Sequence, residues 1–114
     1  MRSFLVFLLF LFTAPLAWAQ KDPDTSEFML PHCKKIEAPS DTFYLGFCSG
    51  AAWAIGVLGP YFQTNVRFCP PDTVSAKEYV KVLISYLEAH PDQQHETLAT
   101  SAIKAFNSEW PCSR

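Results

Sequence analysis

The sequence predicts an all-α protein, a small bundle of about four helices that is stapled by disulfides. Three observations support this fold class. Apolar residues recur at intervals of three and four in several segments, the chain has four cysteines, and capping residues and prolines divide it into short helices. Three-and-four spacing places side chains on one face of a helix, whereas strict alternation would indicate a strand.

The first 19 residues have the features of a secretory signal peptide. Arg2 supplies a positive charge, an apolar run follows, and the small residues Ala17 and Ala19 occupy the determinant positions of a cleavage site. A membrane-spanning helix is the alternative, but the apolar run is only about 15 residues long and spanning requires about 20. We expect cleavage before Gln20 and a periplasmic location. The residue directly after the cleavage site is Gln20 and not a cysteine, so we expect no lipid or other membrane anchor.

The remaining chain, residues 20–114, is expected to form a single domain. Such a small domain buries only about 60 to 65% of its unfolded surface, so covalent cross-links help to stabilise it. The formal net charge of −2 becomes −3 when the single charge of the signal peptide, Arg2, is removed. This weakly acidic balance indicates neither nucleic acid nor an anionic membrane as the partner.

The four cysteines, Cys33, Cys48, Cys69 and Cys112, lack the close spacing of zinc sites and thioredoxin-like redox centres. In an exported chain, two disulfides are the expected outcome. Three pairings are open. The predicted helices favour Cys33 with Cys48 and Cys69 with Cys112, because each pair would then lie near one end of a helical hairpin. Since oxidised cysteines carry no thiolate, no cysteine nucleophile is expected.

The clearest predicted helix follows Ser75, which forms a capping box with Glu78. It stops before Pro91, which disfavours a helical conformation at the preceding residue. Its apolar stripe comprises Tyr79, Val80, Val82, Leu83, Tyr86 and Leu87. A second helix is expected from near Asp92 to near Trp110, antiparallel to the first because the turn between them is short.

Two further helices are expected upstream. One, capped by Ser40 or Asp41, ends at residues 56–60, and its small residues let another helix approach closely; these are Gly50, Ala51, Ala52 and Ala54. A shorter helix lies within residues 26–36, where Pro31 limits its length. Residues 61–72 are expected to form an ordered connecting loop.

We expect no catalytic site, metal or cofactor. Ser101 and Lys104 fit the Ser-x-x-Lys pattern of penicillin-binding enzymes, but the companion motifs are absent and helical residues three apart are neighbours in any case. His90 and His95 are five apart across a predicted turn, unlike the four-apart pair of a helical zinc site. The chain is therefore predicted to bind a partner rather than to be an enzyme.

Aromatic residues are expected mainly to fill the core, with a ligand pocket as the alternative. Those considered are Phe43, Phe47, Trp53, Tyr79, Tyr86 and Phe106. Trp53 is the most ambiguous, because it is large and lies next to the small residues of its helix. Tyr61 and Phe62, in the connecting loop, are candidates for an exposed contact with a partner.

Four motifs occur in a recognisable order. They are Phe-Cys-Ser-Gly at 47–50, Phe-Cys-Pro-Pro at 68–71, a Tyr86-Leu87 helix leading to His-Pro-Asp at 90–92, and Trp-Pro-Cys at 110–112. Together they resemble the Rap/Tai family of type VI secretion immunity proteins over nearly all of the predicted mature chain. The chain departs from the family pattern at residues 51–53, where Ala-Ala-Trp replaces an aromatic residue followed by a branched apolar one.

The resemblance implies an all-helical periplasmic protein, often a homodimer, that binds a peptidoglycan amidase toxin and blocks its active-site cleft. Under this hypothesis the candidate partner-binding residues are Lys77, Lys81, Asp92, Gln93, Gln94 and His95. The alternative for each of them is an ordinary solvated turn or helix face. The alternative function is a periplasmic stress chaperone or envelope assembly factor, since small helical disulfide proteins of that kind have a similar sequence pattern.

Overall fold

The computed structural model describes residues 22–37 and 42–113. Within these ranges the protein has four α-helices, three short 3-10 helices and no β-strand. The elements are α2 (Ser26–Cys33), η2 (Lys34–Glu37), α3 (Thr42–Leu58), η3 (Gly59–Tyr61), α4 (Ala76–Ala89), η4 (Pro91–Gln93) and α5 (Leu98–Glu109). The predicted all-α fold is therefore confirmed. The predicted signal peptide, residues 1–19, and the expected caps Ser40 and Asp41 lie outside the described residues.

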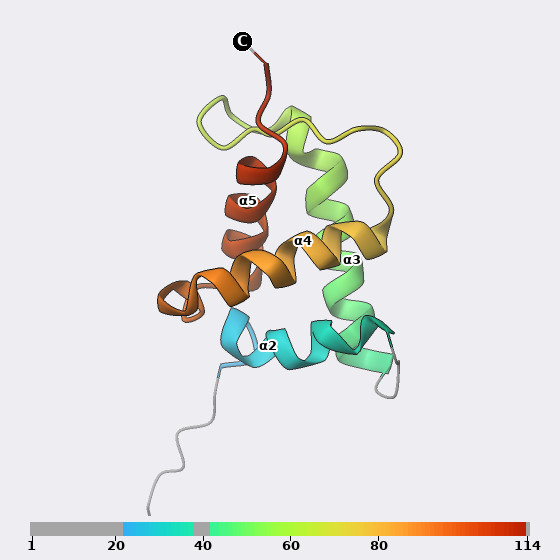
Figure 1. Cartoon of the computed structure of the whole chain (residues 1–114), viewed down its shortest axis with the longest axis vertical. Helices are drawn as coiled ribbons and strands as arrows, with labels where there is room; N and C mark the ends of the chain where they lie inside the picture. Colours follow the sequence, from blue (N-terminus) through green and yellow to red (C-terminus); the bar gives the residue numbers. More distant parts are fainter. Residues whose placement is uncertain (1–21, 38–41, 114) are drawn as a thin grey trace, which may run out of the picture.

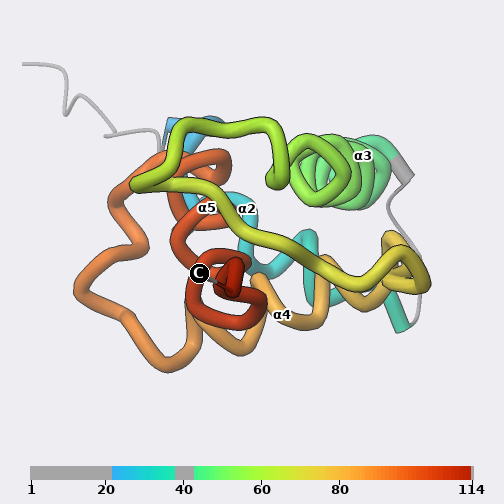
Figure 2. Tube along the Cα trace, turned by 90° about the horizontal axis from the view of Figure 1, so that it is seen from above, coloured from blue at the N-terminus to red at the C-terminus, as the bar shows by residue number. Residues whose placement is uncertain are grey.

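The helices form two crossing layers. In Figure 1, α3 and α5 run along the long axis of the molecule, α4 crosses in front of both, and α2 crosses at the lower end. Figure 2 gives the same arrangement from above, with α4 on one side of the α3 and α5 layer. Each of the four helices packs against the other three, so one core lies where they meet.

The predicted stripe and capping box of α4 are confirmed. The Ser75 backbone N–H donates to Glu78 Oε2 at 2.6 Å, and the Glu78 N–H donates to Ser75 Oγ at 3.2 Å. Together these bonds satisfy two of the donors that a helix start leaves unpaired. They also hold the pKa of the Glu78 carboxyl below its usual range. The helix ends at Ala89, immediately before His90 and Pro91.

The expected start of the last helix near Asp92 is wrong, because α5 begins six residues later, at Leu98. Thr97 is its N-cap, and Thr97 Oγ1 accepts a hydrogen bond from the Thr100 N–H at 3.2 Å. Two carbonyl groups between Asp92 and Leu98 form hydrogen bonds with α2. Those of Gln94 and Glu96 accept from the first N–H groups of α2 at 2.8 Å each. This tertiary contact satisfies the start of α2 and keeps residues 94–97 out of α5.

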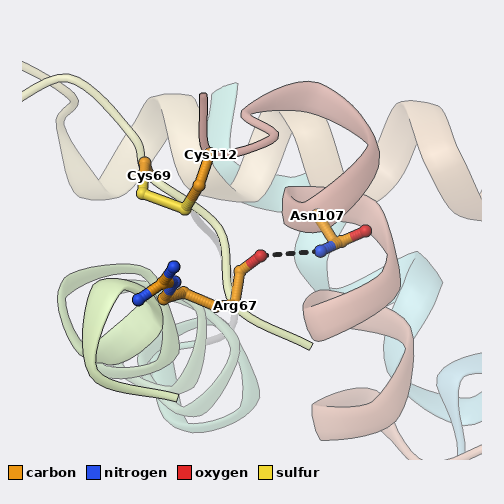
Figure 3. Close-up of a disulfide and its surroundings, with 4 residues drawn as sticks. All are labelled: Arg67, Cys69, Asn107 and Cys112. Carbon is orange, nitrogen blue, oxygen red and sulfur yellow. Dashed lines mark hydrogen bonds between the residues drawn. A yellow bond between two sulfur atoms is a disulfide. The ribbon is translucent and has the colours of Figure 1, made fainter. Parts of the chain in front are cut away.

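The two disulfides pair as the helix positions favoured. Cys33 and Cys48, both fully buried, join the end of α2 to α3 with a Cα–Cα distance of 5.6 Å. Cys69 and Cys112 join the connecting loop to the C-terminal segment at 4.9 Å. Figure 3 shows a second tie beside this bridge, in which Asn107 Nδ2 donates to the Arg67 carbonyl oxygen at 2.8 Å. The long loop between η3 and α4 is thus fixed at two adjacent points, to α5 through Asn107 and to the following C-terminal segment through Cys112.

Buried aromatic rings and small helical residues form the core. The Phe106 ring contacts those of Tyr79 and Phe68, with centroids 5.1 and 5.5 Å apart. A Cβ added at Gly56 would lie 2.4 Å from the Tyr79 ring, and one at Gly59 would lie 2.1 Å from the Phe68 ring. Both rings therefore pack directly on the glycine backbone of α3 and η3, where no larger residue fits.

The expectation that Phe43, Phe47 and Trp53 belong to the core is wrong. They are 73%, 50% and 51% exposed, respectively, whereas Tyr79 and Phe106 are buried as expected and Tyr86 is partly buried. Both faces of α3 are apolar, and Phe43–Tyr61 is long and apolar enough to cross a membrane by length and composition. Its inner face, however, packs in the core and is cross-linked to α2 through Cys48. The outer face of α3 is thus an exposed apolar surface.

Candidate functional site

The segment between α4 and α5, residues 90–97, is called here the 90–97 loop. Figures 1 and 2 both show it projecting at the side of the molecule away from α3. It contains the single turn η4 and a tight continuation in which the Glu96 N–H donates to the Gln93 carbonyl at 3.1 Å. Four of the six predicted partner-binding residues lie in this loop.

Side chains brace the loop against the end of α4. Tyr86 stacks on the His90 ring with centroids 4.1 Å apart, and its hydroxyl donates to Gln93 Oε1 at 2.7 Å. His90 Nδ1 lies 2.8 Å from the Tyr86 carbonyl oxygen, and Gln94 Nε2 donates to the Leu87 carbonyl at 2.9 Å. These contacts supply side-chain partners to carbonyl groups in the last turn of α4, and the Leu87 carbonyl also accepts from the His90 N–H. They give the loop one fixed shape.

The other end of the loop is held by α2 and α5. The backbone N–H groups of Ser26 and Glu27 donate to the carbonyls of Glu96 and Gln94. The Glu96 carboxylate pairs with Lys104 at 2.6 Å, and this hydrogen bond raises the pKa of the lysine above its usual range. The loop is therefore supported at both ends by helices that belong to the core.

Only part of the loop is available to a partner. Asp92 and His95 are exposed, and His95 Nδ1 lies 2.9 Å from the Asp92 carbonyl oxygen. Gln93 and Gln94 are half-buried, and their amides take part in the bracing contacts. The exposed tip thus offers a carboxylate and an imidazole, while the two glutamines hold the loop in shape.

Lys77 and Lys81 belong to a different surface. Both pair with Glu37, each at 3.1 Å, and hydrogen bonds from the two lysines lower the pKa of that carboxyl. At a rise of about 1.5 Å per residue, Lys77 lies about 18 Å along α4 from Ala89, where the loop begins. The structure therefore divides the six predicted residues into two groups at opposite parts of α4.

The Ser-x-x-Lys match does not form a nucleophile and base pair. Ser101 is fully buried, and its Oγ accepts a hydrogen bond from Ser26 Oγ at 2.7 Å. Lys104 extends to Glu96 on the surface. In the part of the chain that the structure describes, no group of three histidine, cysteine or acidic residues is placed to hold a metal ion.

The exposed face of α3 is not among the sites predicted from the sequence. Its signal was present in the same three-and-four spacing, since a second set of apolar residues occupies the side of α3 opposite the core. A groove of about 300 Å³ borders this face between α3 and the start of α5, and its lining includes Phe47, Ala51, Leu98 and Ala99. The structure therefore presents two candidate surfaces, the tip of the 90–97 loop and the outer face of α3.

Comparison with known proteins supplies the family. No curated protein and no solved structure matches the chain. The family model of Rap1a immunity proteins matches residues 17–112, which is nearly the whole chain and includes every helix described above. The chain belongs to the Rap1a immunity protein family.

Proposed function

We propose that this immunity protein acts in the periplasm as a homodimer, where it binds a peptidoglycan amidase effector of the type VI secretion system and blocks its active-site cleft. The 90–97 loop is the proposed inhibitory element. The observation that supports the loop as the inhibitory element is that α4 holds it in place. Hydrogen bonds of the Gln93 and Gln94 side chains fix the exposed tip to α4. A chain that inhibits by binding needs no catalytic group of its own.

A braced loop suits insertion into a cleft. Binding a flexible loop costs conformational entropy, and a loop that already has its bound shape avoids much of that cost. Asp92 and His95 project from the tip and supply a charged acceptor and an imidazole to the groups that line an enzyme cleft. Gln93 and Gln94 act indirectly in this proposal, because their amides maintain the shape of the loop.

Lys77 and Lys81 have a secondary place in the proposal. Their distance from the loop means that one toxin contacts both groups only if the interface extends along α4. Each lysine is also about half exposed and paired with Glu37. Exposed ion pairs contribute little to stability, so these lysines can exchange partners at small cost. We therefore assign them to the rim of the interface.

Identification of the partner comes first in the test. Oxidised protein comprising residues 20–114 serves as bait in an envelope extract of the encoding bacterium or a close sibling. Retention of one peptidoglycan amidase whose activity is lost on binding supports the proposal. Retention of many unrelated envelope proteins, or of none, contradicts it.

Affinity measurements then test the loop. Asp92→Ala combined with His95→Ala should weaken amidase binding at least about 10-fold, as expected when contacts at the centre of an interface are removed. Gln94→Ala should weaken binding while increasing protease cleavage within the loop. The matched control is Gln63→Ala, another exposed loop residue. Affinity that is equal in all variants would exclude the loop from the interface.

The alternative function, a periplasmic stress chaperone, finds one supporting observation in the exposed apolar face of α3. A chaperone activated by acid would need groups that titrate in acid on or beside that face. Thr42–Leu58 contains no aspartate, glutamate or histidine, and Asp24, which lines the bordering groove, is an acidic group beside that face. Suppression of client aggregation at acid pH, with no tight binding of a single partner at neutral pH, would favour the chaperone over the immunity protein.

A further inference from the structure

The exposed large apolar residues among the described residues gather on the outer side of α3 and around its C-terminal end. Its inner face, with Cys48, Ala52 and Gly56, is buried in the core. The exposed large residues on the outer side and at its C-terminal end are Phe43 (73% exposed), Phe47 (50%), Trp53 (51%), Val57 (40%), Leu58 (51%) and Tyr61 (84%). A helix that is apolar all round is normally covered on all sides.

The outer face has the spacing of a helix–helix seam. The residues along its centre alternate by four and three positions, and they are Phe43, Phe47, Gly50, Ala54, Val57 and Tyr61. A four-three alternation keeps one stripe facing a partner helix along its whole length. Cβ atoms added at Gly46 and Gly50 would meet nothing within 4 Å, so the middle of the stripe is open to close approach.

We propose that this face binds the same face of a second copy. The two α3 helices are antiparallel, and the two-fold axis passes between their outer faces at the height of residue 52. The proposal rests on the homodimer of the proposed function and assigns its interface. It extends the seam through η3 to Tyr61, so that both copies contribute residues 43–61.

The pattern of large and small residues is self-complementary in this orientation. An axis beside residue 52 places Phe43 opposite the second copy's Tyr61, Phe47 opposite its Val57, and Gly50 opposite its Ala54. Large residues thus meet at both ends of the seam, and small residues meet at its centre, where the backbones come closest.

Trp53 and the groove lie on opposite flanks of the seam. In an antiparallel pair related by a two-fold axis, each flank of one copy meets the same flank of the other, so the two Trp53 side chains lie beside each other near the axis. The opposite flank carries Ala51 and the groove of about 300 Å³, whose lining also includes Asp24, Phe47, Thr97, Leu98 and Ala99. The two-fold axis therefore brings the two indoles together on one side of the seam and the two grooves together on the other.

The available area is close to what a stable dimer needs. A buried aromatic side chain removes about 150–250 Å² from water, so four aromatics that are half to four-fifths exposed offer on the order of 400–600 Å² per copy. Val57 and Leu58 add to this. A standard interface buries about 800 Å² per partner. The seam and the flanking groove together approach that size.

Other occupants fit the face less well. An interfacial membrane helix combines its apolar face with lysines and arginines, and residues 42–66 contain no charged side chain. A toxin would cover the apolar face only while it is bound. A second copy is always present. The tip of the 90–97 loop lies at the far side of the molecule and stays free in this dimer.

The decisive measurement is the molar mass of oxidised residues 20–114 in solution, without any toxin, by sedimentation and light scattering. Gly50→Arg should fold, since space is open at its Cβ, but it sets two like charges near the axis. We expect the wild type to be a dimer and Gly50→Arg to raise the dimer dissociation constant about 100-fold or more, as expected for a central interface position. Ser108→Arg, on the exposed side of α5, is the matched control and should remain dimeric.

A pair of opposite charges tests whether the two α3 helices are antiparallel. It also tests the interface if Gly50→Arg fails to fold. Phe47→Glu and Val57→Lys should each weaken the dimer. Combined in one chain, they face each other across an antiparallel seam, and the double variant should dimerise more tightly than either single variant. In a parallel seam like charges would meet and the double variant would be the weakest, which would overturn the proposal.

Three further outcomes would overturn the interface. A dimeric Gly50→Arg would place the dimer contact elsewhere while leaving the homodimer intact. A monomeric wild type that sediments with vesicles of phosphatidylethanolamine and phosphatidylglycerol would assign the face to a membrane. A monomeric wild type whose toxin affinity falls on Gly50→Arg substitution would assign it to the toxin and would leave the immunity function standing.

Discussion

The buried hydroxyl pair of Ser26 and Ser101 permits a sharp test of the core. The two residues are 75 positions apart in the sequence, both are fully buried, and Ser26 Oγ donates to Ser101 Oγ at 2.7 Å. Ser101→Ala removes the acceptor and leaves the Ser26 hydroxyl without this partner. Ser26→Ala removes the donor in the same way. The double variant removes both polar groups and replaces them with alanines of similar shape.

The expected magnitudes follow from the asymmetry of hydrogen-bond energetics. A buried polar group that loses its partner costs about 1–3 kcal/mol, whereas replacing both partners with apolar groups is nearly neutral. Each single variant should therefore lower the free energy of unfolding by about 1–2 kcal/mol, and the double variant should lower it by less than about 0.5 kcal/mol. The two substitutions then couple strongly, as expected for residues in direct contact.

Urea denaturation of the oxidised protein, followed by circular dichroism, measures these free energies. Ser108→Ala serves as the control because Ser108 is exposed on the same helix, and its effect should stay within about 0.5 kcal/mol. If the double variant is destabilised by the sum of the two single variants, then the hydroxyl pair is not what couples α2 to α5. The reasoning would also be refuted if neither single variant differs from the control.

The remaining predictions concern the cross-link, the close packing of α3 and the α4 cap. Replacing both Cys69 and Cys112 with alanine opens a 43-residue span and should cost about 4 kcal/mol of unfolding free energy, measured by urea denaturation. Gly56→Ala should cost about 1–3 kcal/mol, because its Cβ would overlap the Tyr79 ring; an unchanged thermal midpoint would contradict that packing. Glu78 has a lowered pKa in the folded state, so its contribution is present above the unfolded pKa and is lost as pH falls through the folded value. The stability difference between wild type and Glu78→Gln should therefore shrink below about pH 4, and a difference that is constant with pH would contradict the charged cap.

The elements predicted best are those whose signals are local. The start of α4 follows from Ser75 and Glu78, which lie three residues apart and bond each other directly. The disulfide pairing follows from the same local information, because placing the helices correctly was enough to favour Cys33 with Cys48. The loop at residues 90–92 was recognised because proline ends a helix by its own geometry.

The failures have non-local causes. The start of α5 moved to Leu98 because the carbonyls of Gln94 and Glu96 bind the N–H groups of α2, about 70 residues earlier in the chain. The core is the favoured prediction for Phe43 and Phe47, and less clearly for Trp53, because both faces of α3 are apolar and periodicity does not tell which of two apolar faces points inward. The internal role of Gln94 depends on its distance from the Leu87 carbonyl, which composition and spacing do not specify.

On the proposed function, the two disulfides also limit where the protein can act. Their spans, residues 33–48 and 69–112, do not overlap, so their stabilising effects of about 3 and about 4 kcal/mol combine to an amount comparable with the whole stability of a typical domain. We therefore predict that the reduced chain is largely unfolded and has no shaped loop to offer. On the proposed function, a cell that makes both proteins keeps its effector uninhibited until secretion, and protection begins only after the immunity protein has been exported and oxidised.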